Sequence, residues 1–331
     1  MTDFALLGSS RSILLDRLMY VSPHTSLNFN PQHFLDLEYG WDKRYCKDFG
    51  QPFSPFNFAQ NCSSVLGSVA GCGLISKLTD QIDYLVFVAN KYIERSGSFY
   101  IKNQFPYSNL FCELHPGWRG AFMNAYTAYG YMFLWRACGK PELLNDASNL
   151  LAGIVSGSDI PLAGDDESGN YFFYEYVFKT NDLYHLCLSE FGLSTDADGY
   201  IRAPVFNGHI HTIFAFLQYQ ELTGDNQFVR YVERALVSME NRLLAQINAI
   251  GEFLYIDKFP LLLDYSQTRP VHQAEGLSEL FPDNAIFKAI AAKFSDIYPS
   301  TELALQVEKK FSEEGYFHAR EIFNKRLRQL A

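Results

Sequence analysis

The sequence lacks any apolar run of about 18 residues, the length that a membrane-spanning helix needs, so we expect no membrane span. Residues 1–20 carry Asp3 and Asp16 and only a short apolar run, which is not typical of a signal peptide. Positive charge is scarce, because 27 Lys and Arg face 37 Asp and Glu and leave a net charge of −10. That balance argues against a broad basic surface and against nucleic acid as a partner.

Cysteine pairs and cofactor fingerprints are also missing. None of the 6 Cys forms a Cys-x-x-Cys pair, and no Cys and His residues have the spacing of a zinc site. Several Cys lie in apolar runs, where a free thiol behaves as a small hydrophobe, and this pattern predicts a reducing, cytoplasmic location. No glycine-rich dinucleotide fingerprint is present, so the sequence predicts no cofactor and no metal. His209 and His211 could share one face of a strand and bind a metal there. On a helix, two residues that are two positions apart point in different directions.

Aromatic residues, by contrast, are abundant: with 29 Phe and 21 Tyr, the aromatic share reaches 16%. Aromatic rings can hold a sugar by packing against its C–H groups, and they also fill protein cores. With 331 residues, 48% of them hydrophobic, the chain is long enough to bury one large core or two medium ones.

A loose internal repeat organises the chain. Residues 73–80, 138–141 and 223–225 each separate two stretches of helical apolar periodicity with Gly or a polar turn, followed by Asp, Pro or Asn. Gly suits the left-handed residue after a helix, and Asp and Pro suit the first turn of the next helix. The expected helices are residues 10–19, 119–137, 141–154, 207–222, 226–247, 284–296 and 301–330.

These hairpins predict a mainly α fold, in which paired α-hairpins form an (α/α) toroid or partial barrel. Residues 98–107, 169–178 and 251–265 alternate Tyr and Phe with polar residues and predict short β-hairpins or long loops at one rim. Long loops on a helical scaffold usually carry binding and catalysis, so this rim is the expected active site. We expect residues 1–50 to be an extended or loop segment packed on a helical catalytic domain of residues 51–331.

Six segments carry aromatic and polar residues in an order and spacing that resemble a known family. They are residues 54–60 (SPFNFAQ), 118–126 (WRGAFMNAY), 174–177 (YEYV), 206–225 (FNGH to LTGD), 255–258 (YIDK) and 265–273 (YSQTRPVHQ). Together they resemble the C-terminal catalytic domain of the D-glucuronyl C5-epimerases, of the heparosan-N-sulfate-glucuronate 5-epimerase type, over about residues 40–275. The chain departs from the family's pattern at residues 123–126, at Val177 and at Lys258, which keeps a charge but loses the two-pronged geometry of Arg.

The resemblance implies C5-epimerisation of D-glucuronate to L-iduronate residues in a polysaccharide. This reaction needs a base on one face of the sugar, a proton donor on the other, and cations or hydrogen-bond donors at the carboxylate. The implied catalytic residues are Tyr176, Tyr255, Tyr265 and Glu175. The implied substrate-binding residues are Gln60, Trp118, Arg119, Asn124, Asn207, Lys258, Arg269 and His272. The partner is then an anionic uronate-containing polysaccharide, for which an acidic chain must gather its basic residues in one groove. A homodimer is left open.

Other functions remain open. A polysaccharide lyase begins with the same abstraction of the C5 proton, so the residues separate it poorly from an epimerase. A glycoside hydrolase on a similar toroid needs two carboxylates about 5–10 Å apart. The candidate carboxylates are Glu175, Asp165, Asp166 and Asp257. A carbohydrate-binding protein without activity is the third alternative, because residues 123–126 depart from the family's pattern.

Overall fold

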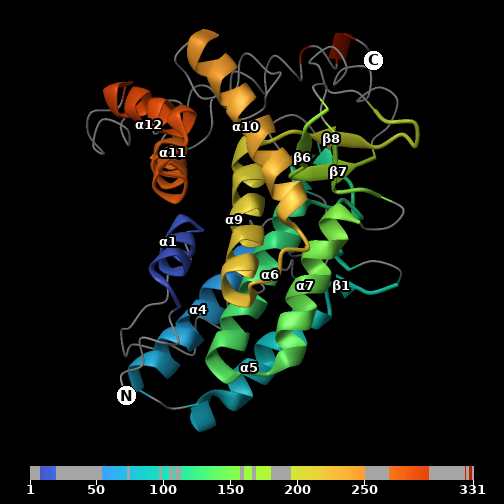
Figure 1. Cartoon of the computed structure of the whole chain (residues 1–331). Helices are drawn as coiled ribbons and strands as arrows, with labels where there is room; N and C mark the ends of the chain where they lie inside the picture. The colour runs from blue at the N-terminus through green and yellow to red at the C-terminus, as the bar shows by residue number, and fades with distance from the viewer. Residues whose placement is uncertain are drawn as a thin grey trace.

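The structure is a computed structural model of the whole chain, and it describes most of the residues between 8 and 297 (Figure 1). The described ranges are residues 8–19, 54–72, 75–96, 99–103, 107–108, 113–156, 160–165, 169–179, 195–249 and 268–297, with residues 325, 328 and 329.

Within the described ranges, four helical hairpins form the body of the structure. They are α4 (Pro55–Cys72) with α5 (Ile75–Asn90), α6 (Ala121–Cys138) with α7 (Pro141–Val155), α9 (Phe206–Thr223) with α10 (Val229–Ala249), and α11 (Thr268–Leu280) with α12 (Ala285–Ile297). A shorter helix, α1 (Ser10–Leu18), packs on α9 and α11. The mainly α fold of paired hairpins that the sequence predicts is therefore confirmed, and so are the expected helices that fall within the described ranges. Residues 301–324 of the last expected helix lie outside them.

The first helix of each of three hairpins lies inside, and the second helix covers it. The inner helices α4 and α9 both pack against α6, while α7 packs on the outer side of α6 and α10 on that of α9. Nearly every position of α6 is buried, whereas α7 buries one stripe that includes Leu143, Ala147, Leu150 and Ile154. A helix that is apolar all round belongs in a core, and a one-sided helix belongs over it. This inner and outer arrangement is that of a partial (α/α) barrel.

The turns between the paired helices follow the local chemistry of the sequence. Gly139 and Gly224 end α6 and α9 in the left-handed conformation, with φ of 71° and 69°. Their backbone N–H groups donate to the carbonyl oxygens of Trp135 and Gln220 at 2.7 and 2.8 Å. Pro141 then starts α7 in its first turn, where its missing N–H group costs nothing. Local signals of this kind are why both boundaries could be predicted.

Short antiparallel strand pairs fill the connections between hairpins. β1 (Ile93–Glu94) pairs with β2 (Tyr100–Ile101), and β3 (Tyr107–Ser108) pairs with β4 (Glu113–Leu114). β5 (Ala163–Asp165) pairs with β6 (Tyr171–Phe173), and β7 (Tyr176–Phe178) pairs with β8 (Ile201–Ala203). The strands predicted in residues 98–107 and 169–178 are confirmed, while residues 251–265 lie outside the described ranges. In Figure 1, β6, β7 and β8 lie near the top, at the end where α9 begins.

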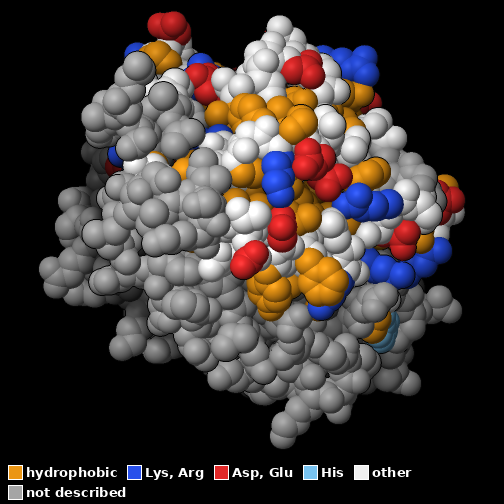
Figure 2. All heavy atoms as spheres, turned by 90° about the horizontal axis from the view of Figure 1, so that it is seen from below, with side chains coloured by type: hydrophobic (Ala, Val, Ile, Leu, Met, Phe, Trp, Pro, Cys, Tyr) orange, Lys and Arg blue, Asp and Glu red, His pale blue; other side chains and the backbone are white. Residues whose placement is uncertain are grey.

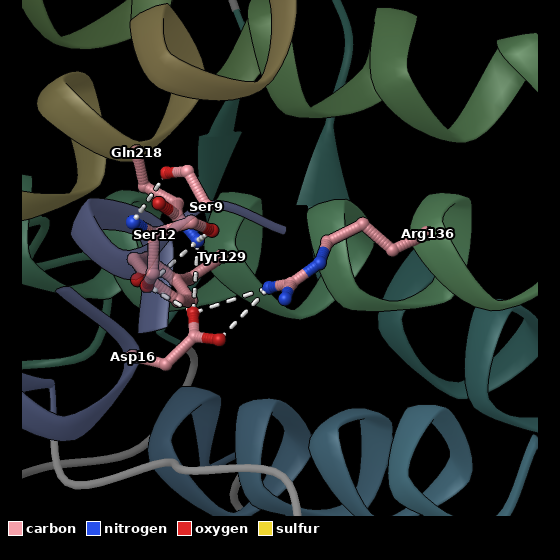
Figure 3. A network of polar contacts seen from close by, with 6 residues as sticks. All are labelled: Ser9, Ser12, Asp16, Tyr129, Arg136 and Gln218. Carbon is pink, nitrogen blue, oxygen red and sulfur yellow. Dashed lines mark hydrogen bonds and ion pairs between the residues drawn. The ribbon is translucent and has the colours of Figure 1, made fainter. Parts of the chain in front are cut away.

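A buried polar network fastens α1 to two inner helices (Figure 3). The Asp16 carboxylate accepts hydrogen bonds from Arg136 Nη1 at 2.9 Å, Gln218 Nε2 at 2.9 Å and the Tyr129 hydroxyl at 3.0 Å. The side chains of Arg136 and Asp16 are only 4% and 1% exposed. Burial raises the pKa of Asp16 from 3.8 to about 6, although the Arg136 charge opposes that shift. Residues 10–18 of the expected N-terminal segment are therefore an integral part of the helical core.

The end of the helices opposite the strands shows no dominance of one charge. Seen from below, its described part mixes acidic, basic and apolar side chains (Figure 2). Just after α5, the Lys91 ammonium lies 4.6 Å from the centre of the exposed Phe87 ring of that helix, and Lys140 pairs with Asp83 at 3.0 Å. No helix within the described ranges is both long and apolar enough to cross a membrane.

Candidate functional site

The segment between β6 and β7 is held against the start of α6. Its Tyr174 carbonyl oxygen accepts a hydrogen bond from the Ala121 N–H at 2.9 Å, and Val177 exchanges two backbone hydrogen bonds with Arg119 at 2.9 and 2.8 Å. Glu175 lies between these bonded residues and is buried, with only 4% of its surface exposed. A carboxylate is seldom buried unless the fold offers it partners, so Glu175 marks the candidate site.

Two glycines make room for Glu175. A Cβ atom at Gly120 would collide with the Glu175 carbonyl oxygen. A Cβ atom at Gly208, in the first turn of α9, would lie 2.7 Å from Cβ and Cγ of Glu175 and closer still to Oε2. The Glu175 side chain therefore lies directly on the first turn of α9. Backbone N–H groups at a helix start carry partial positive charge, which stabilises an ionised carboxylate placed there.

The loop before α6 brings a cation and an indole to the same end. The Arg119 guanidinium carbon lies 3.5 Å from the centre of the Tyr100 ring of β2, a cation–π contact. The Trp118 ring is buried and lies 5.8 Å from the ring of Tyr176. Asn103 holds the loop in place by donating from Nδ2 to the Trp118 carbonyl oxygen at 3.1 Å. Tyr176, Trp118 and Arg119 thus surround the segment that carries Glu175.

Asn207 is the second residue of α9 and lies next to Gly208. Its side chain is buried, and its Oδ1 meets no hydrogen-bond donor among the residues that the structure describes. A buried amide oxygen usually has a partner, so this unsatisfied acceptor is a feature of the candidate site. Five of the predicted site residues therefore gather here: Glu175, Tyr176, Trp118, Arg119 and Asn207.

Asn124 has a different environment from the one expected of a substrate-binding residue. Its Oδ1 accepts from the Ile101 N–H at 2.9 Å, and its Nδ2 donates to the carbonyl oxygens of Phe99 and Leu150 at 3.0 and 3.1 Å. The amide is used by backbone groups of β2 and α7, so Asn124 fastens the first strand pair to the α6/α7 hairpin. A mid-helix Asn flanked by apolar residues was the sequence signal for this role.

The remaining predicted residues are spread along the chain. Gln60 is exposed on α4, where its carbonyl oxygen accepts from the hydroxyls of Ser63 and Ser64. Arg269 and His272 lie in α11, and their side chains are outside the description. Tyr255, Lys258 and Tyr265, together with Asp166 and Asp257, lie outside the described residues.

Basic and aromatic side chains alternate around the β7/β8 hairpin. The Lys179 ammonium lies 4.3 Å from the Tyr200 ring centre, and the Arg202 guanidinium lies 6.0 Å from that of Tyr174. Asp196 pairs with Arg202 at 2.6 Å and so offsets part of this charge. Asp165, on the neighbouring β5, is exposed and pairs with Arg234 at 2.6 Å. This end of the protein thus carries Lys179 together with two Arg–Asp ion pairs.

The two histidines of α9 point apart, as expected for a helix. His209 Nδ1 accepts from the Phe173 N–H at 3.0 Å, and its Nε2 donates to the Ala235 carbonyl oxygen at 3.1 Å, so both ring nitrogens serve the fold. His211 faces α6, with its ring 5.8 Å from that of Phe122 and 5.5 Å from that of Tyr126. The described residues contain no group of three or more His, Cys, Asp or Glu side chains that could hold a metal ion.

Comparison with known proteins gives a weak likeness to solved structures. No family model matches this chain, and no curated protein matches it. A family 76 glycoside hydrolase from a bovine strain of Bacteroides thetaiotaomicron is 9% identical with a TM-score of 0.41, over 71% of this chain and 45% of that one. A family 76 mannosidase from B. thetaiotaomicron VPI-5482 is 13% identical with a TM-score of 0.41, over 72% and 58%.

A third structure, PssZ from Listeria monocytogenes, is 10% identical with a TM-score of 0.32, over 92% of this chain and 97% of that one. The match spans about half the length of the two glycoside hydrolases. Similarity at this level carries no information about the reaction that this chain performs.

Proposed function

We propose that this chain is a carbohydrate-active enzyme that acts on a polysaccharide at the end where α6 and α9 begin. Glu175 is the residue that transfers a proton in this proposal. The observation that carries it is the burial of the Glu175 side chain on the first turn of α9, in the space that Gly208 leaves free. A carboxylate that is fixed in place and shielded from water is what general acid–base catalysis needs.

One reaction that fits these residues is inversion at C5 of a glucuronate unit, giving iduronate. Glu175 would act as the base, and the neighbouring Tyr176 would donate or relay the returning proton. Arg119, held 3.5 Å from the Tyr100 ring, would stabilise the substrate carboxylate as negative charge develops in the enediolate. Asn207 Oδ1 would accept a hydrogen bond from a sugar hydroxyl. The buried Arg119, whose backbone pairs with Val177 two residues after Glu175, favours this reaction. Tyr255, Tyr265, Lys258, Arg269 and His272 would complete the site.

The second reaction is hydrolysis of a glycosidic bond, in which Glu175 would act as general acid with a second carboxylate as base or nucleophile. The observation in its favour is that Asp165 lies in β5 and Asp196 in the turn before β8, so both belong to the connections next to the Glu175 segment. Both acids are paired with arginines, so one pair would have to open when the substrate binds. The cytoplasmic location and the homodimer stay predictions, as does the division at residue 50.

One experiment separates these reactions. The purified protein is incubated in deuterium oxide with N-acetylheparosan, N-sulfated heparosan and α-mannan, and the products are followed by proton NMR. Deuterium at C5 with new iduronate signals identifies the epimerase, new reducing ends identify the hydrolase, and unsaturated ends identify a lyase. Glu175→Gln is expected to lower turnover by about 100-fold or more, because general acid–base groups contribute that much.

Glu233→Gln is the matched control, because Glu233 is an exposed residue of α10. It should keep full activity, and circular dichroism should show both variants folded. Wild-type turnover in a folded Glu175→Gln protein would refute the assignment of Glu175.

A further inference from the structure

His211 lies in the second turn of α9 and is almost completely buried, with 1% of its surface exposed. Aromatic rings of α6 and α9 surround it: Tyr126 at 5.5 Å, Phe122 at 5.8 Å and Phe214 at 6.4 Å between ring centres. Removing a titratable ring from water in this way costs free energy unless the surroundings compensate it. The sequence marked His211 only as a weak metal candidate, so its place beside the candidate site was unexpected.

Helix geometry puts His211 next to Glu175. His211 follows Gly208 by three residues, and side chains three apart share one face of a helix at about 5–6 Å. A side chain on a helix also leans toward the helix start, so the imidazole leans toward Gly208 and the carboxylate that lies on it. Phe122 gives a second link, because its ring contacts His211 while its helix begins beside Glu175 at Gly120.

A glutamine on α11 fixes the protonation of the ring. Gln273 is fully buried, and its Nε2 lies 3.3 Å from Nε2 of His211. An amide nitrogen can only donate, so His211 Nε2 accepts and the neutral ring carries its hydrogen on Nδ1. His209, two residues earlier, has the opposite arrangement, with its hydrogen on Nε2. On the same helix, both ring nitrogens of His209 therefore form hydrogen bonds with backbone groups. The neutral ring of His211 carries its hydrogen on Nδ1.

We propose that His211 is a positioning residue for Glu175, coupled to its carboxylate across the first turns of α9 and oriented by Gln273. The inference rests on the proposed function, in which Glu175 transfers the proton. His211 would stabilise the ionised carboxylate and keep it oriented between proton transfers. Of the titratable groups around the ring, Tyr126 from α6 contacts it, and Glu175 from the β6–β7 segment reaches it in this proposal across Gly208, while α11 contributes the neutral amide of Gln273.

The test measures coupling directly and needs no substrate. Histidine is labelled with carbon-13 at Cε1, and the pKa of His211 is followed by NMR in the wild-type and Glu175→Gln proteins, with His211→Gln identifying the signal. Loss of a carboxylate within about 4–6 Å should lower the pKa of His211 by about one unit or more. His209 is the internal reference, and its titration should not change.

An unchanged His211 titration, including no titration in either protein, would overturn the proposal. On the polysaccharide that the enzyme turns over, His211→Gln should lower kcat by about tenfold or more with little change in KM, and should shift the acid limb of the pH profile. A wild-type pH profile in that folded variant would also overturn the proposal. Failure to turn over any polysaccharide would refute the proposed function alone, because the NMR coupling is measured without one.

Discussion

The Asp16 network predicts an unusual dependence of stability on pH. Replacing Asp16 by Asn keeps the size of the side chain and one acceptor oxygen but removes the charge. In the wild-type protein this carboxylate lies between Arg136, Tyr129 and Gln218, away from water (Figure 3). The question is whether the ion pair with Arg136 outweighs the loss of hydration, and the raised pKa of Asp16 says that it does not.

The size of the effect follows from linkage. The pKa of Asp16 is about 6 in the folded protein against 3.8 as a reference, because burial disfavours the charged form. A group with a raised folded pKa contributes stability below its unfolded value, and that contribution is lost as the pH rises through the folded value. A difference of about 2.2 units at 1.36 kcal/mol per unit gives about 3 kcal/mol. About 0.6 kcal/mol of this is already lost at pH 4, which lies just above the unfolded pKa. The wild-type protein should therefore lose about 2.4 kcal/mol relative to Asp16→Asn between pH 4 and pH 7.5.

Urea denaturation followed by circular dichroism at pH 4.0, 5.0, 6.0 and 7.5 measures this difference. Each free energy of unfolding is compared between the wild-type protein and Asp16→Asn at the same pH. Asp83→Asn is the control, because Asp83 forms an exposed pair with Lys140, and its effect should stay below about 1 kcal/mol at every pH. The reasoning would be refuted if the free energy of unfolding of the wild-type protein rose relative to that of Asp16→Asn as the pH increases. The ion pair with Arg136 would then outweigh the effect of burial.

Three further changes test the site and its scaffold. Gly208→Ala places a methyl group in the Glu175 side chain, so activity should fall at least about tenfold in a kinetic assay. Gly164→Ala, where the methyl group would meet only Tyr174 at ordinary contact distances of 3.6 and 3.7 Å, should leave activity within about twofold, and equal effects would contradict the close approach. Asn124→Ala removes the hydrogen-bond partner of three backbone groups, and urea denaturation should show a loss of about 2–4 kcal/mol in the free energy of unfolding. A loss below about 1 kcal/mol would argue against the role of Asn124 in holding the first strand pair to the α6/α7 hairpin. Gly139→Ala forces a side chain into the left-handed region and should lower the free energy of unfolding by about 1–2 kcal/mol, and no loss would show that the turn after α6 can relax.

The sequence predicted what depends on neighbouring residues. The turns at Gly139 and Gly224 could be placed because a left-handed Gly and a following Pro or polar residue are local signals. The strands at Tyr171–Phe173 and Tyr176–Phe178 could be placed from aromatic alternation, although each is only three residues long because the chain turns at Tyr174 and Glu175 to meet α6.

Contacts between distant segments could not be predicted in this way. Asp16 meets Arg136 across 120 residues, and Glu175 meets Gly208 only because the β7/β8 pair returns the chain to the start of α9. Asn124 has the polarity of a binding residue, but its neighbours in space are backbone groups of β2 and α7, which no spacing reveals. The family resemblance singled out Glu175 and Tyr176 as candidates, whereas the contacts of Tyr100 with Arg119 and of His211 with Gln273 became visible only from the packing.

The way in which α1 is held has a consequence for the order of folding. Its Ser12 hydroxyl lies 2.7 Å from Gln218 Nε2, a residue 206 positions later in the chain. During synthesis, α1 therefore leaves the ribosome long before α9 exists to receive it. Contacts of such wide separation form slowly, because the intervening chain must first be ordered. Although α1 is synthesised early, we expect it to be among the last elements to pack. Until it does, Arg136 lacks the Asp16 carboxylate as its partner.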